Sequence, residues 1–292
     1  MKNNARMSQL TRGLVAVAIV GSGLAIYHNE AVAAVSASRH NLSATAGTGN
    51  RTAGAGSEIC VFCHTPHGAD VSTAGAPLWN KRFTAPFGTA FSPYVATSTT
   101  DGAFATDGTG TGGFLSGASL ACLSCHDGTQ AIDNLLNAPG SGGIDSTGGG
   151  DDGRGFTWTS GDNTNLNSNG YLVSNANLGK DLSNDHPIGI RYCGGGPVVA
   201  TPGAACVDPD FVSPSSQLIG STTQFWVNTT AGAATSAREK TDMLLYNRNF
   251  AAGGAGPAVE CASCHDVHSS ATLFLRMGSN NSSQICLACH VK

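Results

Sequence analysis

The sequence is poor in large apolar side chains and in charge. Leu, Ile, Val and Phe account for 57 of its 292 residues, and only 12% of the residues are charged. So small a share of large apolar residues is at the edge of what a packed core requires. The net charge of −4 is nevertheless too small to keep the chain unfolded by self-repulsion. We therefore expect the chain to fold with the help of another source of apolar surface, such as a large apolar cofactor.

Long hydrophobic runs are missing from the chain except at its N-terminus. Basic residues that include Lys2 and Arg6 precede an apolar run at 13–26, and small residues follow at 31–33. This pattern predicts a secretory signal peptide over residues 1–33, with an uncleaved anchor as the alternative. No later stretch approaches the 18 or so apolar residues that span a bilayer, so we expect no transmembrane segment in the mature chain.

The mature chain also lacks an excess of basic residues. Without residues 1–33 it carries 12 basic and 18 acidic residues, so nucleic acid is not an expected partner. No P-loop, no Ser–His–Asp set and no G-x-G-x-x-G between a strand and a helix stands out. The glycine clusters follow no apolar strand and are typical of loops.

Few windows of the sequence show a clean helical or strand period. Turn and loop composition prevails in residues 138–256. We expect a single domain over 34–292, in three parts: 34–137, 138–256 and 257–292. Short helices are expected at 119–126, 238–247 and 283–290.

What the chain does contain is a five-residue motif, C-x-x-C-H, repeated four times. A shuffled chain with 10 Cys and 9 His would contain it by chance only about 0.01 times. Two parts of the chain, 34–137 and 257–292, carry two copies each, and the middle part carries none. The copies are Cys60/Cys63/His64, Cys122/Cys125/His126, Cys261/Cys264/His265 and Cys286/Cys289/His290, called the first to fourth motifs.

The spacing of this motif suits covalent attachment of haem c. Two cysteines three residues apart form thioethers with the two vinyl groups on one porphyrin edge, and the adjacent histidine ligates the iron from the proximal side. A four-cysteine zinc site is the alternative, but a histidine after every cysteine pair in an exported chain favours haem. A thioredoxin-like motif would need a βαβ setting. We expect four covalently bound haem c groups.

The remaining histidines match the number of irons. Removing the signal-peptide histidine and the four motif histidines from nine leaves four. This match predicts that each iron has two axial histidines and no open position. The expected distal ligands are His40, His67, His186 and His268.

Two of these histidines lie close to a proximal one. His67 follows His64 by three residues, and His268 follows His265 by three. Rings at this spacing leave the chain on nearly the same side, so neither can reach the far face of its own haem. We expect each to ligate a neighbouring haem and thereby bring two porphyrins close together. The expected pairs are His67 with the haem of the second motif and His268 with that of the fourth.

The other two histidines lie far from any motif histidine. His40 lies on a polar arm over 36–56, 20 residues before Cys60, from which it can reach a haem of its own chain or of another. His186 precedes Pro187, which restricts its backbone to extended conformations suited to presenting a ligand from a loop.

Two cysteines, Cys193 and Cys206, fall outside the motifs. In an oxidising compartment a disulfide between them is expected, with two free thiols as the alternative. Closing a loop of about 14 residues would stabilise the fold by about 3 kcal/mol on the chain-entropy estimate.

Six-coordinate iron offers no position to a substrate, so these ligands favour electron transfer over catalysis and no catalytic residue is expected. Two histidines give iron a lower potential than histidine with methionine. Close haems of low potential pass electrons by hopping.

The sequence around the motifs resembles the OmcE-type tetrahaem c-type cytochromes, which assemble into extracellular conductive filaments, or nanowires, in metal-reducing microbes. The similarity covers most of the mature chain and keeps the motif order; it is weakest at 138–180 and in the loop between the two extra cysteines. The similar segments are RHNLS (39–43), EICVFCHTPHGA (58–69), APLWNK (76–81), CLSCHDGT (122–129), DLSNDHPIG (181–189), ECASCHDVH (260–268), FLR (274–276) and ICLACHVK (285–292).

This resemblance implies a mostly irregular, coil-rich multihaem fold with a few short helices packed around four stacked haems. It implies end-to-end polymerisation, with one distal histidine donated across the subunit interface, for which His40 is the expected residue. Expected partners are copies of the chain, upstream periplasmic or outer-membrane cytochromes and extracellular electron acceptors, with a secreted, extracellular or cell-surface location. A discrete periplasmic carrier with all ligands in cis is the alternative, and a multihaem reductase is a third.

Overall fold

The structure is a computed structural model of the chain. The predicted signal peptide, residues 1–33, lies outside the residues that it describes. The described residues are 35–44, 51–53, 57–73, 75–76, 78–83, 91–94, 103–108, 113–137, 157–159, 165–167, 169–195, 204–230 and 237–291.

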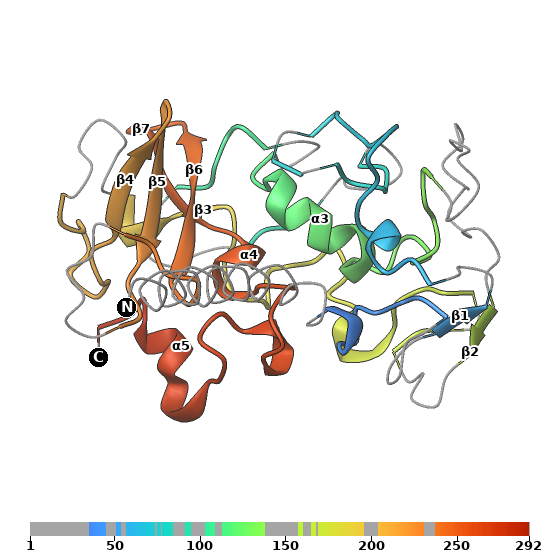
Figure 1. The fold of residues 1–292 in the computed structure, drawn as a ribbon. Helices are drawn as coiled ribbons and strands as arrows, with labels where there is room; N and C mark the ends of the chain where they lie inside the picture. Colours follow the sequence, from blue (N-terminus) through green and yellow to red (C-terminus); the bar gives the residue numbers. More distant parts are fainter. Residues whose placement is uncertain are drawn as a thin grey trace, which may run out of the picture.

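The main element is a five-stranded antiparallel sheet with strand order β3-β7-β6-β5-β4 (Figure 1). Four of the strands follow one another along the chain and pair as successive hairpins, and β3 joins the edge beside β7. The strands are β3 (Ile190–Arg191), β4 (Ser215–Ile219), β5 (Thr222–Val227), β6 (Met243–Phe250) and β7 (Gly254–Val259).

Local chemistry explains the hairpin of β4 and β5. Only Gly220 and Ser221 separate the two strands, and Gly220 has a φ of +62°, which glycine adopts without strain. In β5, Thr223, Phe225 and Val227 are buried while Thr222 and Gln224 are exposed, so side chains alternate along most of the strand. β-branched and aromatic residues favour this conformation.

One face of the sheet covers an apolar cluster. Phe225, Val227, Met243 and Leu245 are buried there, together with Tyr192. Ile285, Ala288 and two motif cysteines, Cys264 and Cys289, pack against the same cluster from the C-terminal part of the chain. The sheet therefore supports the third and fourth motifs.

The remaining described elements are short. The longest helix is α3 (Gly117–His126), which Ser116 caps by accepting a hydrogen bond from the amide of Ala118 at 3.2 Å. A two-stranded sheet pairs β1 (Arg51–Ala53) with β2 (Thr157–Thr159) at the opposite end of the molecule from the large sheet (Figure 1). The others are α4 (Cys261–Cys264), α5 (Gln284–Leu287) and the 3-10 turns η1 (Cys60–Phe62), η2 (Ser174–Ala176), η3 (Tyr192–Gly195), η4 (Thr272–Phe274) and η5 (Asn281–Ser283).

The expected fold class, a coil-rich multihaem fold with a few short helices packed around four stacked haems, is wrong. The structure contains a five-stranded antiparallel sheet, with all five of its strands beginning within residues 138–256, the part expected to be loop. The helix expected at 238–247 is also wrong, because the second half of that segment belongs to strand β6. The helix at 119–126 is confirmed by α3, and that at 283–290 is reduced to α5.

Within the described ranges, no helix is long and apolar enough to cross a bilayer.

Candidate functional site

Each of the four motifs forms one helical turn that runs from its first cysteine to its histidine. The second motif ends α3, whose bounds include His126. In the other three motifs the histidine amide donates a hydrogen bond to the carbonyl oxygen of the first cysteine. The distances are 2.8 Å for His64 to Cys60, 3.2 Å for His265 to Cys261 and 2.9 Å for His290 to Cys286.

This turn geometry fits haem attachment. Residues three apart on a helical turn lie on one side of it, so the two thiols of a motif can face one porphyrin edge. All eight motif thiols are free, whereas Cys193 and Cys206 are joined in a disulfide with their Cα atoms 4.9 Å apart.

Two proximal rings are oriented for iron by backbone carbonyls. The Nδ1 atom of His126 lies 2.8 Å from the carbonyl oxygen of Ala176, and that of His265 lies 2.8 Å from the carbonyl oxygen of Leu273. A carbonyl oxygen only accepts hydrogen bonds, so each Nδ1 carries the proton and Nε2 is left for the metal. The donor set therefore fits a haem iron at these motifs.

The motifs lie next to one another in their order along the chain. Burial raises the pKa of Cys63 to about 12, and the adjacent thiol of Cys125 contributes next, which places the first motif beside the second. The thiols of Cys122 and Cys261 interact, which places the second motif beside the third; this interaction, followed by burial, raises the pKa of Cys122.

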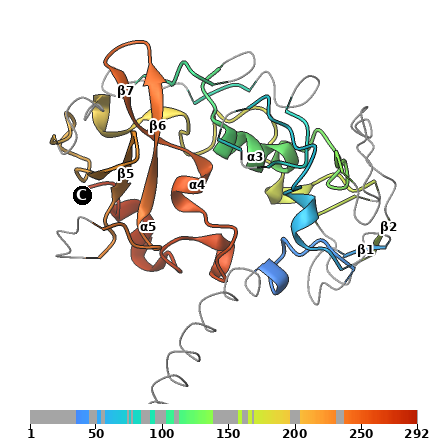
Figure 2. The ribbon, with the colours of Figure 1, turned by 45° about the horizontal axis from the view of Figure 1, so that its top comes forward.

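The third motif likewise lies next to the fourth. Burial raises the pKa of Cys264 to about 12, with the thiol of Cys289 as the next contribution. Both cysteines pack against the apolar cluster under the sheet. Figures 1 and 2 show the corresponding elements in space, with α4 between α3 and the large sheet.

A buried polar network fixes the second motif relative to the third. Glu260, which precedes Cys261 and caps α4, is 1% exposed. Its carboxylate accepts hydrogen bonds from the hydroxyl of Ser119 on α3 and from the guanidinium of Arg248 on β6. Arg248 also pairs with Asp107 at 2.7 Å. Burial raises the pKa of Glu260, while the charge of Arg248 opposes that shift.

The first motif is tied to the second by an indole. The Nε1 atom of Trp79 donates a hydrogen bond to the hydroxyl of Ser124, between the cysteines of the second motif, at 3.0 Å. The same indole meets the ring of His64 edge-on, with ring centroids 5.4 Å apart. Phe62 packs with Leu42 in a cluster that also receives Cys63 and Cys125.

Three of the four expected distal histidines are exposed: His67, His186 and His268. The Nδ1 atom of His186 lies 3.0 Å from the carbonyl oxygen of Pro187, so Nε2 is the nitrogen of this ring that could bind a metal. The Nδ1 atom of His268 lies 3.8 Å from Asp266.

His40 is the distal candidate that the structure brings close to a motif histidine. Its ring centroid lies 6.1 Å from that of His126, and its ring stacks on Phe274 at 4.4 Å. Burial lowers the pKa of His40 to about 4, with His126, His265 and His268 as further contributions in that order.

The residues that connect the motifs could not be found from sequence patterns, because they contact one another across long separations in the chain. Ser119 and Glu260 are 141 residues apart, and Trp79 and Ser124 are 45 apart. The one available signal was polarity at positions next to motif cysteines, since Glu260, Ser263 and Ser124 flank them.

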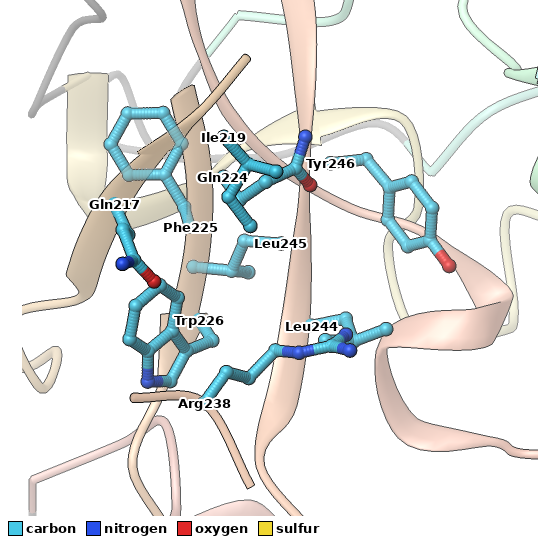
Figure 3. Close-up of a pocket in the computed structure, with 9 residues that line it drawn as sticks. All are labelled: Gln217, Ile219, Gln224, Phe225, Trp226, Arg238, Leu244, Leu245 and Tyr246. Atoms are coloured by element: carbon cyan, nitrogen blue, oxygen red, sulfur yellow. The ribbon is translucent and has the colours of Figure 1, made fainter. Parts of the chain in front are cut away.

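A hollow over the large sheet is too small to be a typical ligand-binding pocket. Its volume is about 200 Å³, and Figure 3 shows its lining, in which Arg238 is the charged side chain. Drug-sized ligands usually occupy pockets of roughly 300–1,000 Å³. The phenol of Tyr246 points away from Trp226 in this view.

Comparison with known families supports the interpretation of the motifs. The family described as a doubled CXXCH motif matches residues 255–292, which contain the third and fourth motifs. This match points to a multihaem c-type cytochrome. Such motifs indicate covalently bound haem c and a role in electron transfer. No curated protein matches the sequence.

Proposed function

We propose that the chain carries four covalently bound haem c groups, one at each motif, and transfers electrons along them. The observation that carries this proposal is the row of neighbouring thiols, Cys63 with Cys125, Cys122 with Cys261 and Cys264 with Cys289. Attachment points that lie near one another place the edges of successive porphyrins close together. A bound haem supplies an iron that cycles between the ferrous and ferric states.

The residues of the chain have separate tasks in this function. Each thiol pair fixes a porphyrin edge, and each motif histidine ligates iron. Carbonyls such as that of Ala176 orient the proximal rings by holding the Nδ1 proton. Four distal histidines then close the remaining axial positions, so that no iron takes a substrate and the protein is not an enzyme.

We further propose that the protein is exported and polymerises into an extracellular conductive filament, in which one distal histidine crosses the subunit interface. The signal-peptide pattern of residues 1–33 and the resemblance of CHTPHGA and NDHPIG to filament cytochromes support this. Electrons would enter from upstream periplasmic or outer-membrane cytochromes and leave to extracellular acceptors.

Haem content and axial ligation test the core of the proposal. The mature chain, produced in a host with cytochrome c maturation, is expected to carry four haems by mass and by pyridine haemochrome. In the assembled protein the reduced form should not bind carbon monoxide, because no axial position is open. A different haem number contradicts the tetrahaem assignment, and high-spin haem in the resting protein favours a reductase.

Electron microscopy tests the filament. Negative-stain images of secreted material should contain fibres of uniform width. Discrete particles that hold four six-coordinate haems would instead favour a periplasmic electron carrier with every ligand in cis.

A further inference from the structure

The segment that bears His40 packs against other parts of the same chain. Asn41 and Ser43 are buried, at 2% and 0% exposure, and Leu42 belongs to the cluster around Phe62. The side chain of Asn41 donates to the carbonyl of Ser36 at 2.8 Å and accepts from the hydroxyl of Ser43 at 2.7 Å. His40 is therefore presented by an ordered turn that packs beside the first motif.

The separation of His40 and His126 suits two ligands on one iron. Their ring centroids lie 6.1 Å apart, with the ring planes at 84°. Two metal–nitrogen bonds of about 2.0–2.1 Å, with about 1.1 Å from each nitrogen to its ring centre, place the centroids about 6.2 Å apart.

Neighbouring groups hold both rings in place. The carbonyl of Ala176 accepts a hydrogen bond from the Nδ1 of His126, so Nε2 is the nitrogen left for iron. Phe274 stacks on the flat face of His40 with an interplanar angle of 14°. A porphyrin stands nearly perpendicular to its axial imidazoles, so a ring on the face of His40 does not compete with the nitrogen at its edge.

We propose that His40 is the distal axial ligand of the haem attached at Cys122 and Cys125, opposite His126 and within the same chain. This inference rests on the proposed tetrahaem function. It differs from two expectations of the sequence, that His67 serves this iron and that His40 crosses a subunit interface. His67 is then left for a different iron, and a ligand shared between subunits would be another exposed histidine.

The test uses full-length holoprotein that gel filtration isolates as a monomer. Wild-type monomer should not bind carbon monoxide at the haem of the second motif. His40→Ala should retain four haems, gain one carbon monoxide equivalent in the reduced form, and lose a highly anisotropic low-spin EPR signal, which near-perpendicular imidazoles produce. Added imidazole should restore the low-spin state, and His40→Met should keep it while raising one potential.

Removal of the second haem identifies the iron that His40 ligates. In a Cys122→Ser/Cys125→Ser background, His40→Ala should add no carbon monoxide binding, whereas the matched change His186→Ala should still add it. If His40→Ala still adds carbon monoxide binding in this background, the assignment is overturned. It is also overturned if the second haem of the wild-type monomer binds carbon monoxide and stops binding it only when subunits assemble.

The outcomes also separate this inference from the proposed function. A wild-type protein with fewer than four haems contradicts the tetrahaem function itself. Four bound haems, with the haem of the second motif still closed to carbon monoxide after His40→Ala, contradict the assignment of His40 alone.

Discussion

The amide of Cys261 donates a hydrogen bond to the hydroxyl of Ser119 at 3.1 Å. The first cysteine of the third motif is thereby attached to α3, the helix of the second motif, one turn before Cys122. Together with the carboxylate of Glu260, this contact sets the spacing between two haem attachment sites. Electron transfer between haems depends steeply on their separation, so a buried polar network that fixes this spacing serves the function as well as the fold.

Loss of the arginine in this network should destabilise the protein. Arg248→Met leaves the buried carboxylate of Glu260 without its countercharge, and removing one partner of a buried pair costs about 3–5 kcal/mol. The double variant Arg248→Met/Glu260→Gln should recover most of that loss, because no buried charge remains. Urea unfolding of the holoproteins measures both, and equal stabilities of wild type and Arg248→Met would contradict a structural role for the pair.

The same variant should change the dependence of stability on pH. Burial raises the pKa of Glu260 in the folded state, and the charge of Arg248 limits that rise. A raised carboxyl pKa contributes stability below the unfolded value of about 4.3, and this stability is lost as the pH rises towards the folded value. Arg248→Met should therefore lose more stability than wild type between about pH 4 and about pH 7.5. Thermal unfolding at both pH values measures the difference, which Glu260→Gln should abolish.

Removal of the disulfide should weaken the sheet end of the molecule. Cys193 and Cys206 close a loop with a sequence separation of 13 residues, for which chain entropy predicts about 3 kcal/mol. Cys193→Ala/Cys206→Ala should lower the free energy of unfolding by about that amount and leave the haem count unchanged. Wild-type protein treated with a thiol reductant provides the control, since thioethers resist it. Unchanged stability in both samples would argue against the bond.

A buried lysine should stabilise the conformation of the loop that follows the second motif. Lys81 is 0% exposed, and its ammonium donates hydrogen bonds to the carbonyls of Ala131, Ile132 and Asn134 at 3.3, 2.6 and 3.3 Å. Lys81→Met leaves these acceptors without a donor, and each unsatisfied buried group costs about 1–3 kcal/mol. We expect a loss of at least about 2 kcal/mol and faster amide exchange in the loop. The exposed Lys240→Met serves as the matched control.

The indole contact between the first two motifs should behave as a coupled pair. Trp79→Phe removes the hydrogen bond from Nε1 to Ser124, at a cost of about 1 kcal/mol. Ser124→Ala should cost a similar amount, and the double variant should cost less than the sum of the two. A double-mutant cycle by chemical denaturation tests this, and strict additivity would show that the contact contributes nothing.

The sequence was sufficient wherever the chemistry is local. A haem attachment motif is complete within five residues, so the role of Cys122, Cys125 and His126 can be predicted without knowledge of the fold. Helix α3 could be predicted for the same reason, since hydrogen bonds within one segment determine it. Most of the large sheet escaped prediction because β7 contains glycine and Pro257, and β6 contains residues with ordinary helix propensity.

One hairpin of the sheet could have been predicted, from the Gly220–Ser221 turn between β4 and β5.

Sequence alone thus determined the number of attachment motifs and the residue types that hold a haem, because each motif needs only its immediate neighbours. Tertiary structure alone decided which motifs adjoin and that His40 lies beside His126. His40 and His126 are 86 positions apart in the numbering, and Ser119 reaches Glu260 over 141 residues. Contacts over such separations depend on how the sheet and α3 pack, and local sequence patterns do not predict that packing.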